Sequence, residues 1–212
     1  SVMVIDTEYF TGAGQPTLEQ LASAIREFRE AGKKVIAYGT AFEQSQYYLA
    51  AQADEVYLDP LGMVIIDGYE SYQWFWKELF DKVGIDINVF RVGAYKSAVE
   101  PFSRTDMSPE AREETAQYLG SLWSSYQRAV AEARKLDAKA ISAYVASLVD
   151  RVSKGESPAQ VALQAGLITG VKTRLEVEQE VAELVGEDEV TGSFKAVPVE
   201  DYVRVVRAER RL

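Results

Sequence analysis

Short apolar runs alternate with amphipathic segments of helix length through the first hundred residues. The runs VMVID and KKVIAYG have the length and β-branched content of buried strands, and the segments between such runs repeat their apolar residues at helical spacing. This alternation is typical of an α/β fold, a parallel sheet layered by helices. The predicted strands are residues 2–6, 33–39, 54–62, 63–68 and 87–93, and the predicted helices among them are residues 17–32, 42–53 and 70–84.

Start and stop signals delimit the first of these helices. Thr17 is a suitable N-cap, and Gln20, three residues later, completes a capping box. The apolar residues at positions 18, 21, 25 and 28 keep helical spacing, and Gly32 follows them. We therefore expect a helix that is capped by Thr17 and terminated by Gly32.

The second half of the chain is predicted to be mainly helical. Ser108 is the expected N-cap of a long helix with Pro109 at its first position. The aromatic residues at 118, 123 and 126 in this helix are predicted to pack internally or to face a partner helix. Further helices are predicted at residues 137–150, 157–168 and 172–186.

No low-complexity linker separates the two halves, so residues 1–212 are predicted to form a single domain. Within it we expect an α/β core over residues 1–106 and a helical packing or assembly part over residues 107–212. The basic tail YVRVVRAERRL is interpreted as a solvated helix end or linker rather than an anion site. The sequence opens without an initiator methionine, and we expect the chain to be a fragment of a longer protein.

Charge and composition then exclude several classes of function. The 23 basic and 33 acidic residues give a net charge of −10, which argues against nucleic acid as a partner. The sequence contains no cysteine and no histidine, so thiol catalysis, a Ser-His-Asp triad and most zinc sites are excluded. No metal or organic cofactor is expected. No apolar run is long enough to span a membrane.

One lysine stands out in the stretch FRVGAYKSAVEPF. Lys96 follows an apolar, strand-like run, with a glycine before it and a proline after it. In an apolar wall a lysine loses its charge more easily and can act as a base. The alternative is a surface lysine paired with Glu100 or another acid, and spacing alone favours this alternative. Ser97 is a poor nucleophile for Lys96, because neighbours in an extended chain point to opposite sides.

Two weaker candidates lie nearer the amino terminus. Gly12 and Gly14 follow a predicted strand, where glycines can aim backbone amides at an oxyanion, although a plain tight turn explains them equally well. Ser45 lies near the start of a predicted helix, where the helix dipole favours an anion and where a serine is usually a cap. Neither position identifies a site by itself.

Three longer stretches resemble a known family. RVGAYKSAVEPFSRTDMSPEAREE, GQPTLEQLASAIREFREAGKKVIAYG and SQYYLAAQADEVYLDPLG closely resemble the amino-terminal half of the long, tandem-duplicated signal peptide peptidase A family, peptidase family S49. The resemblance covers nearly the whole chain and is strongest from Thr17 to Arg112. It implies a ClpP/crotonase-like fold and peptide cleavage by a Ser-Lys dyad, a serine endopeptidase activity.

The resemblance also implies roles for individual residues. The lysine of the family motif falls on Lys96, which is then the general base that takes the proton of the serine hydroxyl. Tyr95 and Glu100 are expected to orient the lysine loop. In the long family members the second half supplies the serine. With this motif included, the general-base role of Lys96 is preferred over a surface position.

Two departures from the family pattern indicate half an active site. Gln44 falls where the second half of such proteins has its nucleophilic serine, so Ser45 lies one residue late. Thr11-Gly12-Ala13 stands where the family has a P-G-G oxyanion turn. The chain alone is therefore expected to be inactive.

The resemblance further implies partners and a location. The expected partners are signal peptides and other short peptides as substrates, the second half of the same protein, and neighbouring protomers of a homo-oligomeric ring. The relatives face the periplasm from the bacterial inner membrane through an anchor that is absent from this sequence, and this fragment is expected to be soluble. The alternatives are a non-catalytic assembly domain and, less favoured, a crotonase-like acyl-CoA enzyme.

Overall fold

The computed structural model describes residues 1–88 and 97–209. Its internal contacts divide the chain into two units, which are described separately. The first unit combines Ser1–Ile66 with Val130–Leu212, and the second is Asp67–Ala129. The predicted single domain with its boundary at residue 106 remains a prediction.

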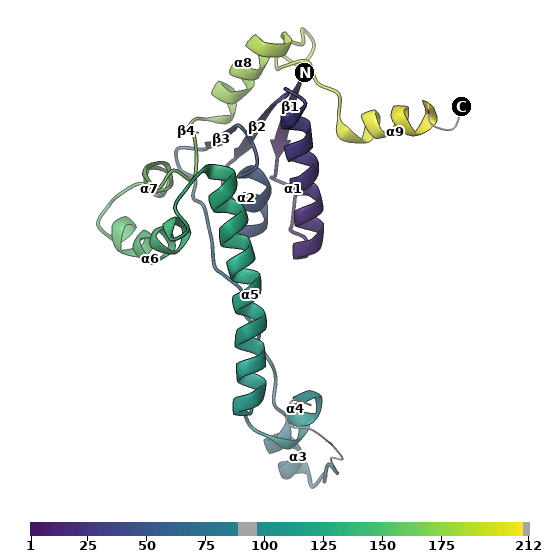
Figure 1. Ribbon diagram of the computed structural model, residues 1–212, viewed down its shortest axis with the longest axis vertical. Helices are drawn as coiled ribbons and strands as arrows, with labels where there is room; N and C mark the ends of the chain where they lie inside the picture. Colours follow the sequence, from purple (N-terminus) through teal and green to yellow (C-terminus); the bar gives the residue numbers. More distant parts are fainter. Residues whose placement is uncertain (89–96, 210–212) are drawn as a thin grey trace. The chain divides into compact units, whose positions relative to one another are not determined.

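The first unit is built on a four-stranded parallel sheet in the order β1-β2-β3-β4 (Figure 1). Its register pairs Val4 with Ile36, Tyr38 with Tyr57, and Leu58 with Val171. The predicted α/β class with a parallel sheet is confirmed. The strands are β1 (Val2–Asp6), β2 (Lys34–Gly39), β3 (Glu55–Leu58) and β4 (Gly170–Val171).

Buried apolar residues of the strands pack against helices that cover the sheet. In β2, Ile36 and Tyr38 belong to a buried cluster with Val177 and Val181 of α8, which therefore packs on that face. The intervening β2 residues are also fully buried. The helices of this unit are α1 (Gln15–Glu30), α2 (Gln44–Ala50), α6 (Ala140–Ser153), α7 (Pro158–Gln164), α8 (Arg174–Val185) and α9 (Val199–Glu209).

The first helix begins two residues earlier than its sequence signals predict. Gly14 is the N-cap, α1 starts at Gln15, and Thr17 lies inside the first turn. Pro16 explains the shift, because its fixed φ suits the first turn and its missing N–H needs no partner there. Thr17 was thus wrong as the cap. The predicted stop is confirmed, since Gly32 has a φ of +73° and its N–H donates to the carbonyl of Arg29.

The predicted strand at residues 63–68 is also wrong. Only one isolated parallel bridge forms there, between Phe42 and Val64. Residues 170–171 pair with β3 instead, so the fourth strand comes from a part of the chain where no strand was predicted. A two-residue strand carries no periodic signal, which is why the sequence did not reveal β4.

The second unit contains short helices and most of one long helix. Its elements are α3 (Lys77–Val83), a 3₁₀ turn at Ser97–Val99, α4 (Glu100–Ser103) and the greater part of α5 (Pro109–Arg134). Of the helix predicted at residues 70–84, only Lys77–Val83 is helical. The N–H of Trp76 donates to the carbonyl of Pro101 at 2.6 Å, a bond outside the helical ladder. Of the strand predicted at 87–93, residues 87–88 are irregular and the others lie outside the described residues.

The long helix starts as predicted. The hydroxyl oxygen of Ser108 accepts a hydrogen bond from the N–H of Ala111 at 3.1 Å, and Pro109 is the first helical residue. Of the aromatic residues in α5, Tyr126 is fully buried and stacks on Trp123 with ring centroids 5.6 Å apart, whereas Tyr118 is exposed. The predicted packing role therefore holds for Trp123 and Tyr126, but Tyr118 is free for contact with solvent.

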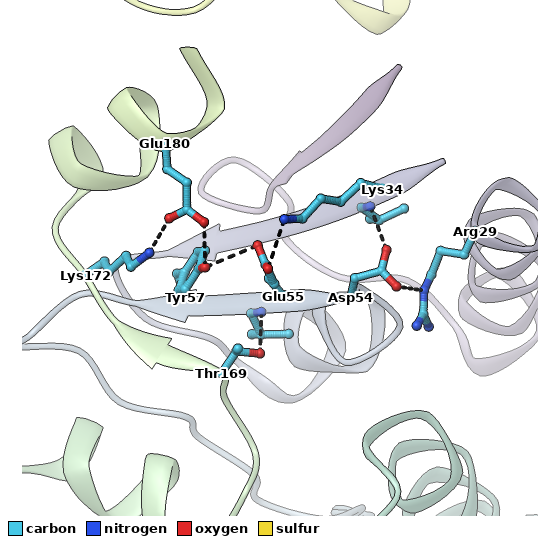
Figure 2. Close-up of polar contacts among 10 residues, drawn as sticks. Arg29, Lys34, Asp54, Glu55, Tyr57, Thr169, Lys172 and Glu180 are labelled. Carbon is cyan, nitrogen blue, oxygen red and sulfur yellow. Dashed lines mark hydrogen bonds and ion pairs between the residues drawn. The ribbon is translucent and has the colours of Figure 1, made fainter. Parts of the chain in front are cut away.

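A polar network holds α8 to the sheet (Figure 2). The Tyr57 hydroxyl donates to Glu180 Oε1 at 2.9 Å, and the ammonium group of Lys172 donates to the other oxygen of Glu180. Burial and then the Glu180 carboxylate raise the pKa of Tyr57 to about 12. Burial alone raises the pKa of Glu180, but the hydrogen bonds from Lys172 and Tyr57 outweigh it and leave this pKa below its ordinary value.

Replacing Glu180 with glutamine should therefore cost stability only where the carboxylate is ionised. A lowered folded-state pKa adds stability above the unfolded-state pKa, and this contribution is lost as the pH falls through the folded-state value. We expect Glu180→Gln to lower the free energy of unfolding by about 1 kcal/mol at pH 7, after solvent screening, and by progressively less as the pH falls from 7 toward 3.

Urea unfolding of the two proteins across that pH range measures the difference. Glu183→Gln, on an exposed position of the same helix, is the matched control and should change little at either pH. An equal loss in both variants, or a loss from Glu180→Gln that is as large at pH 3 as at pH 7, contradicts the assigned role of the network.

Candidate active site

The predicted base lies outside the part of the chain that the structure describes. Lys96 and Tyr95 both belong to residues 89–96, and the description resumes at Ser97. Glu100, the third site residue predicted from the sequence, is described and is only 1% exposed. The surroundings of the candidate site are therefore built from Glu100 and the segment that follows it.

Glu100 is bound to the first turn of α5. The backbone N–H of Ser108 donates to Glu100 Oε2 at 3.0 Å, and the Ser108 hydroxyl donates to Oε1 at 2.6 Å. The same hydroxyl accepts the N–H of Ala111. A carboxylate that receives two such donors at the positive end of a helix can stay ionised in a buried place. Glu100 thus connects the start of α4 to the start of α5.

Further hydrogen bonds fix the segment that follows the lysine. The Ser103 hydroxyl donates to the carbonyl of Val99 at 3.0 Å, and the N–H of Arg104 donates to the carbonyl of Glu100 at 2.8 Å. Glu100 is buried, and its hydrogen bonds to Ser108 anchor the segment from residue 97 to residue 108 internally.

Aromatic residues lie against the same segment. The hydrogen bond from Trp76 to Pro101 joins the chain before α3 to α4. The rings of Phe80 in α3 and Phe102 in α4 stack with centroids 6.2 Å apart. Aromatic side chains of α3 and α4 are therefore in contact beside Pro101.

The glycine turn and the start of α2 come together in the first unit. Gly12 has a φ of +111°, and a Cβ atom at this position would lie 3.5 Å from the hydroxyl oxygen of Ser45. The amide nitrogen of Gln46 donates to the carbonyls of Thr7 and Phe10 at 2.9 and 3.0 Å. The two weak candidates of the sequence, the turn after β1 and the helix that carries Ser45, are thus neighbours in the structure.

The start of α2 is capped by a neighbouring pair of side chains. Glu43 is the N-cap and forms a capping box with Gln46, and Gln44 is the first helical residue. Ser45 follows as the second residue of α2, which keeps it off the cap position that the sequence suggested for a lone serine. Gln44 therefore occupies the place at the helix start where the resemblance expects the nucleophile.

Sequence reasoning missed the two contacts that organise these regions. Ser108 was predicted only as a helix cap, and its bond to Glu100, eight residues away, has no local signature. Gln46 was not singled out, although a glutamine three residues after Glu43 is the signal of a capping box.

Metal and membrane sites were also considered. Across residues 1–88 and 97–209, no group of three or more acidic residues is placed to hold a metal ion. No helix within the described residues combines the length and the apolar content that crossing a bilayer requires.

Comparison with known proteins gives a consistent result. The model of peptidase family S49 matches residues 27–187. Protease 4 of Haemophilus influenzae is 41% identical over 205 residues, which are 95% of this chain and 33% of the relative. Protease 4 of Salmonella typhi is 37% identical over 94% of this chain and 32% of its own length, and the chloroplastic serine protease SPPA of Arabidopsis thaliana is 26% identical over 89% and 26%. The chain thus spans about a third of the length of the two Protease 4 relatives.

The contact between Glu100 and Ser108 makes a direct prediction for stability. Ser108→Ala removes one charge-assisted hydrogen bond and the helix cap, so we expect a loss of about 2 kcal/mol in the free energy of unfolding. Urea unfolding followed by circular dichroism measures it. Ser124→Ala, an exposed position of the same helix, should leave the stability nearly unchanged. Equal stability of the two variants contradicts an anchoring role for Ser108.

Proposed function

The chain belongs to peptidase family S49, and from this premise we propose that it supplies Lys96 as the general base of a composite Ser-Lys peptidase site. S49 proteins have a ClpP/crotonase-like fold, and the parallel sheet of this chain agrees with it. The observation that carries the proposal is the family match, because residues 27–187 include the whole stretch around Lys96. The anchoring of Glu100 to Ser108 supports it, since it fixes the chain four residues beyond Lys96.

The proposed reaction begins with a neutral lysine. Lys96 takes the proton of a serine hydroxyl, the serine oxygen attacks the carbonyl carbon of the peptide bond, and the protonated lysine then gives its proton to the leaving amine. Water hydrolyses the resulting acyl-enzyme by the same proton transfers. An apolar wall around the amine would favour the neutral form of the lysine, because burial penalises the charge.

The serine of this site is proposed to come from outside the chain. Gln44 stands at the matching position here, and Thr11-Gly12-Ala13 stands at the oxyanion turn. The source is either the remainder of a longer protein or a neighbouring protomer of a ring. The Protease 4 relatives are about three times as long as the matched region, which is long enough to include such a second half.

The substrates and location follow from the same proposal. Signal peptides and other short peptides are the proposed substrates, and a membrane-anchored protein facing the periplasm is the proposed setting. The relatives, Protease 4 and the serine protease SPPA, support a peptidase.

Replacing Lys96 with methionine tests the catalytic role. In the full-length protein we expect Lys96→Met to lower turnover of a fluorogenic signal-peptide-like substrate by about 100-fold or more, the usual contribution of a general base. Circular dichroism and size-exclusion chromatography check that fold and assembly are kept. Lys154→Met, which replaces an exposed lysine, is the matched control. Unchanged turnover in Lys96→Met would support a non-catalytic assembly domain instead.

The missing nucleophile makes a second prediction. Since Gln44 holds the matching place, Ser45→Ala in the full-length protein should leave kcat and KM unchanged, and the 212-residue chain alone should not hydrolyse the peptide. Measurable hydrolysis by the isolated chain that disappears in Ser45→Ala contradicts the composite site.

A further inference from the structure

The outward side of α8 and the turn that follows it form an open groove in the first unit, which we call the α8 groove. Val177 and Val181 hold the opposite side of α8 against the sheet. The α8 groove has a volume of about 510 Å³, and its lining includes the apolar side chains of Leu175 and Ala182. Leu175 is 62% exposed, so this apolar lining is open to another molecule.

Hydrogen bonds hold the turn beside the helix. The Ser193 hydroxyl donates to Glu178 Oε2 at 3.2 Å, which joins the turn to α8. The N–H of Asp188 donates to the carbonyl of Ser193 at 2.8 Å, and Glu187 forms an antiparallel bridge with Phe194. Phe194 also packs against the buried cluster between the sheet and α8. The fold of one copy therefore shapes the α8 groove without help from a partner.

Negative charge dominates around the α8 groove. Its lining includes the carboxylates of Glu178, Glu183 and Glu187. Residues 174–195 carry seven acidic and two basic side chains, a formal net charge of −5. An apolar strip with acidic borders is complementary to an amphipathic helix that carries basic residues beside its apolar face.

The same chain contains a helix of this kind. The apolar face of α9 consists of Val199, Tyr202, Val203 and Val206, which keep the spacing of one side of a helix. None of the residues of α9 is buried, and Val199 and Tyr202 are more than 60% exposed. Helices shorter than about 12–15 residues are marginal in water without packing, and α9 has 11 residues. The apolar face of α9 therefore needs a partner.

Positive charge lies at the border of this apolar face. Arg207 lies one turn after Val203, and Arg204 lies three residues before Arg207 on the same side of the helix. Arg204 is 3.1 Å from the carboxylate of Asp201, an exposed ion pair of the kind that contributes little. Residues 204–212 carry four arginines and one glutamate, a formal net charge of +3. This charge is opposite to that of the α8 groove.

We propose that the apolar face of α9 from one copy of the chain binds in the α8 groove of a second copy. A second copy supplies both the apolar face and the opposite charge, and α9 is not packed in the groove of its own chain, since none of its residues is buried. Each protomer then donates one helix and accepts another, and such a head-to-tail contact closes into a ring where the rotation allows it. The inference does not depend on the role of Lys96.

An anionic bilayer is a poorer partner for α9. Glu200 and Asp201 lie in its first turn, where they would be repelled by the headgroups. In the α8 groove of a second copy, the first turn of α9 can extend past the groove while Arg204 and Arg207 meet its carboxylates. Charge therefore favours the contact between copies.

Single cysteines test the contact, because this chain contains none. Two full-length proteins, free of other cysteines and carrying tags of different mass, are co-expressed and oxidised. One carries Ala182→Cys and the other Val199→Cys, Val203→Cys or Val206→Cys, which sample the apolar face of α9 along its length. We expect a disulfide-linked pair containing both tags from at least one combination. Val205→Cys, on another side of α9, is the matched control and should give about tenfold less of this product.

Charge reversal tests the electrostatic part of the contact. Glu183→Arg in the protein with Ala182→Cys should lower the yield of the linked pair about tenfold, and Arg207→Glu in its partner should restore it. Both positions are exposed, and circular dichroism checks that the variants fold. A yield that does not respond to Glu183→Arg overturns the assigned complementarity.

The other occupants of the groove give different results. Absence of the linked pair from all three positions of α9 overturns the proposal. So does a disulfide that forms only when both cysteines are on the same protein and leaves it at the mass of one chain, because α9 then lies in its own groove. Absence of the linked pair together with binding to phosphatidylglycerol vesicles that Arg207→Glu abolishes places α9 on a membrane instead.

Discussion

The hydrogen bonds between Glu100 and Ser108 are the constraint on which the organisation of the second unit depends. A buried carboxylate is tolerated only where donors satisfy it, and Ser108, directly before α5, supplies two of them. Ser108 serves two purposes, because its hydroxyl also caps the helix. The short segment between the candidate lysine and the long helix is thereby closed into a fixed loop.

In the composite site that we propose, the first unit is the half that does not supply the nucleophile. Gly12 and the start of α2 are neighbours, as an oxyanion turn and a nucleophile would be. The helix nevertheless begins with Gln44. The side chains of Glu43 and Gln46 accept hydrogen bonds from backbone N–H groups at its start and form a capping box. Because these hydrogen bonds cap the helix, its start does not need a serine at position 44. The composite site that we propose assigns the missing chemistry to another polypeptide segment.

Much of the fold follows from the sequence, since β1, β2, β3 and the start of α5 have strong local signals. VMVID and KKVIAYG are apolar runs of strand length, and Ser108-Pro109 is a clear helix start. The start of α1 was misjudged because Pro16 outweighs the capping box at Thr17. β4 has two residues and depends on its pairing with β3, a contact more than a hundred residues apart along the chain.

The candidate site was less accessible to sequence reasoning. Lys96 was found only through a family motif, since spacing alone favoured a surface lysine. The role of Glu100 in orienting the lysine loop stays a prediction, and its burial and its bonds to Ser108 depend on how the chain folds back over eight residues. Residues 70–84 were predicted as one amphipathic helix, but the N–H of Trp76 bonds to the carbonyl of Pro101 and the helix starts only at Lys77.

The measurement that tests the central claim most directly is the pH dependence of kcat/KM for the full-length wild-type protein. This profile reports the ionisation of the essential base in the free enzyme. If Lys96 is that base, activity should rise with pH to a plateau through an inflection at about 7 to 8, the range of lysines that act as general bases. An inflection at about 10.4, the value of an ordinary lysine, or a rate independent of pH contradicts the account.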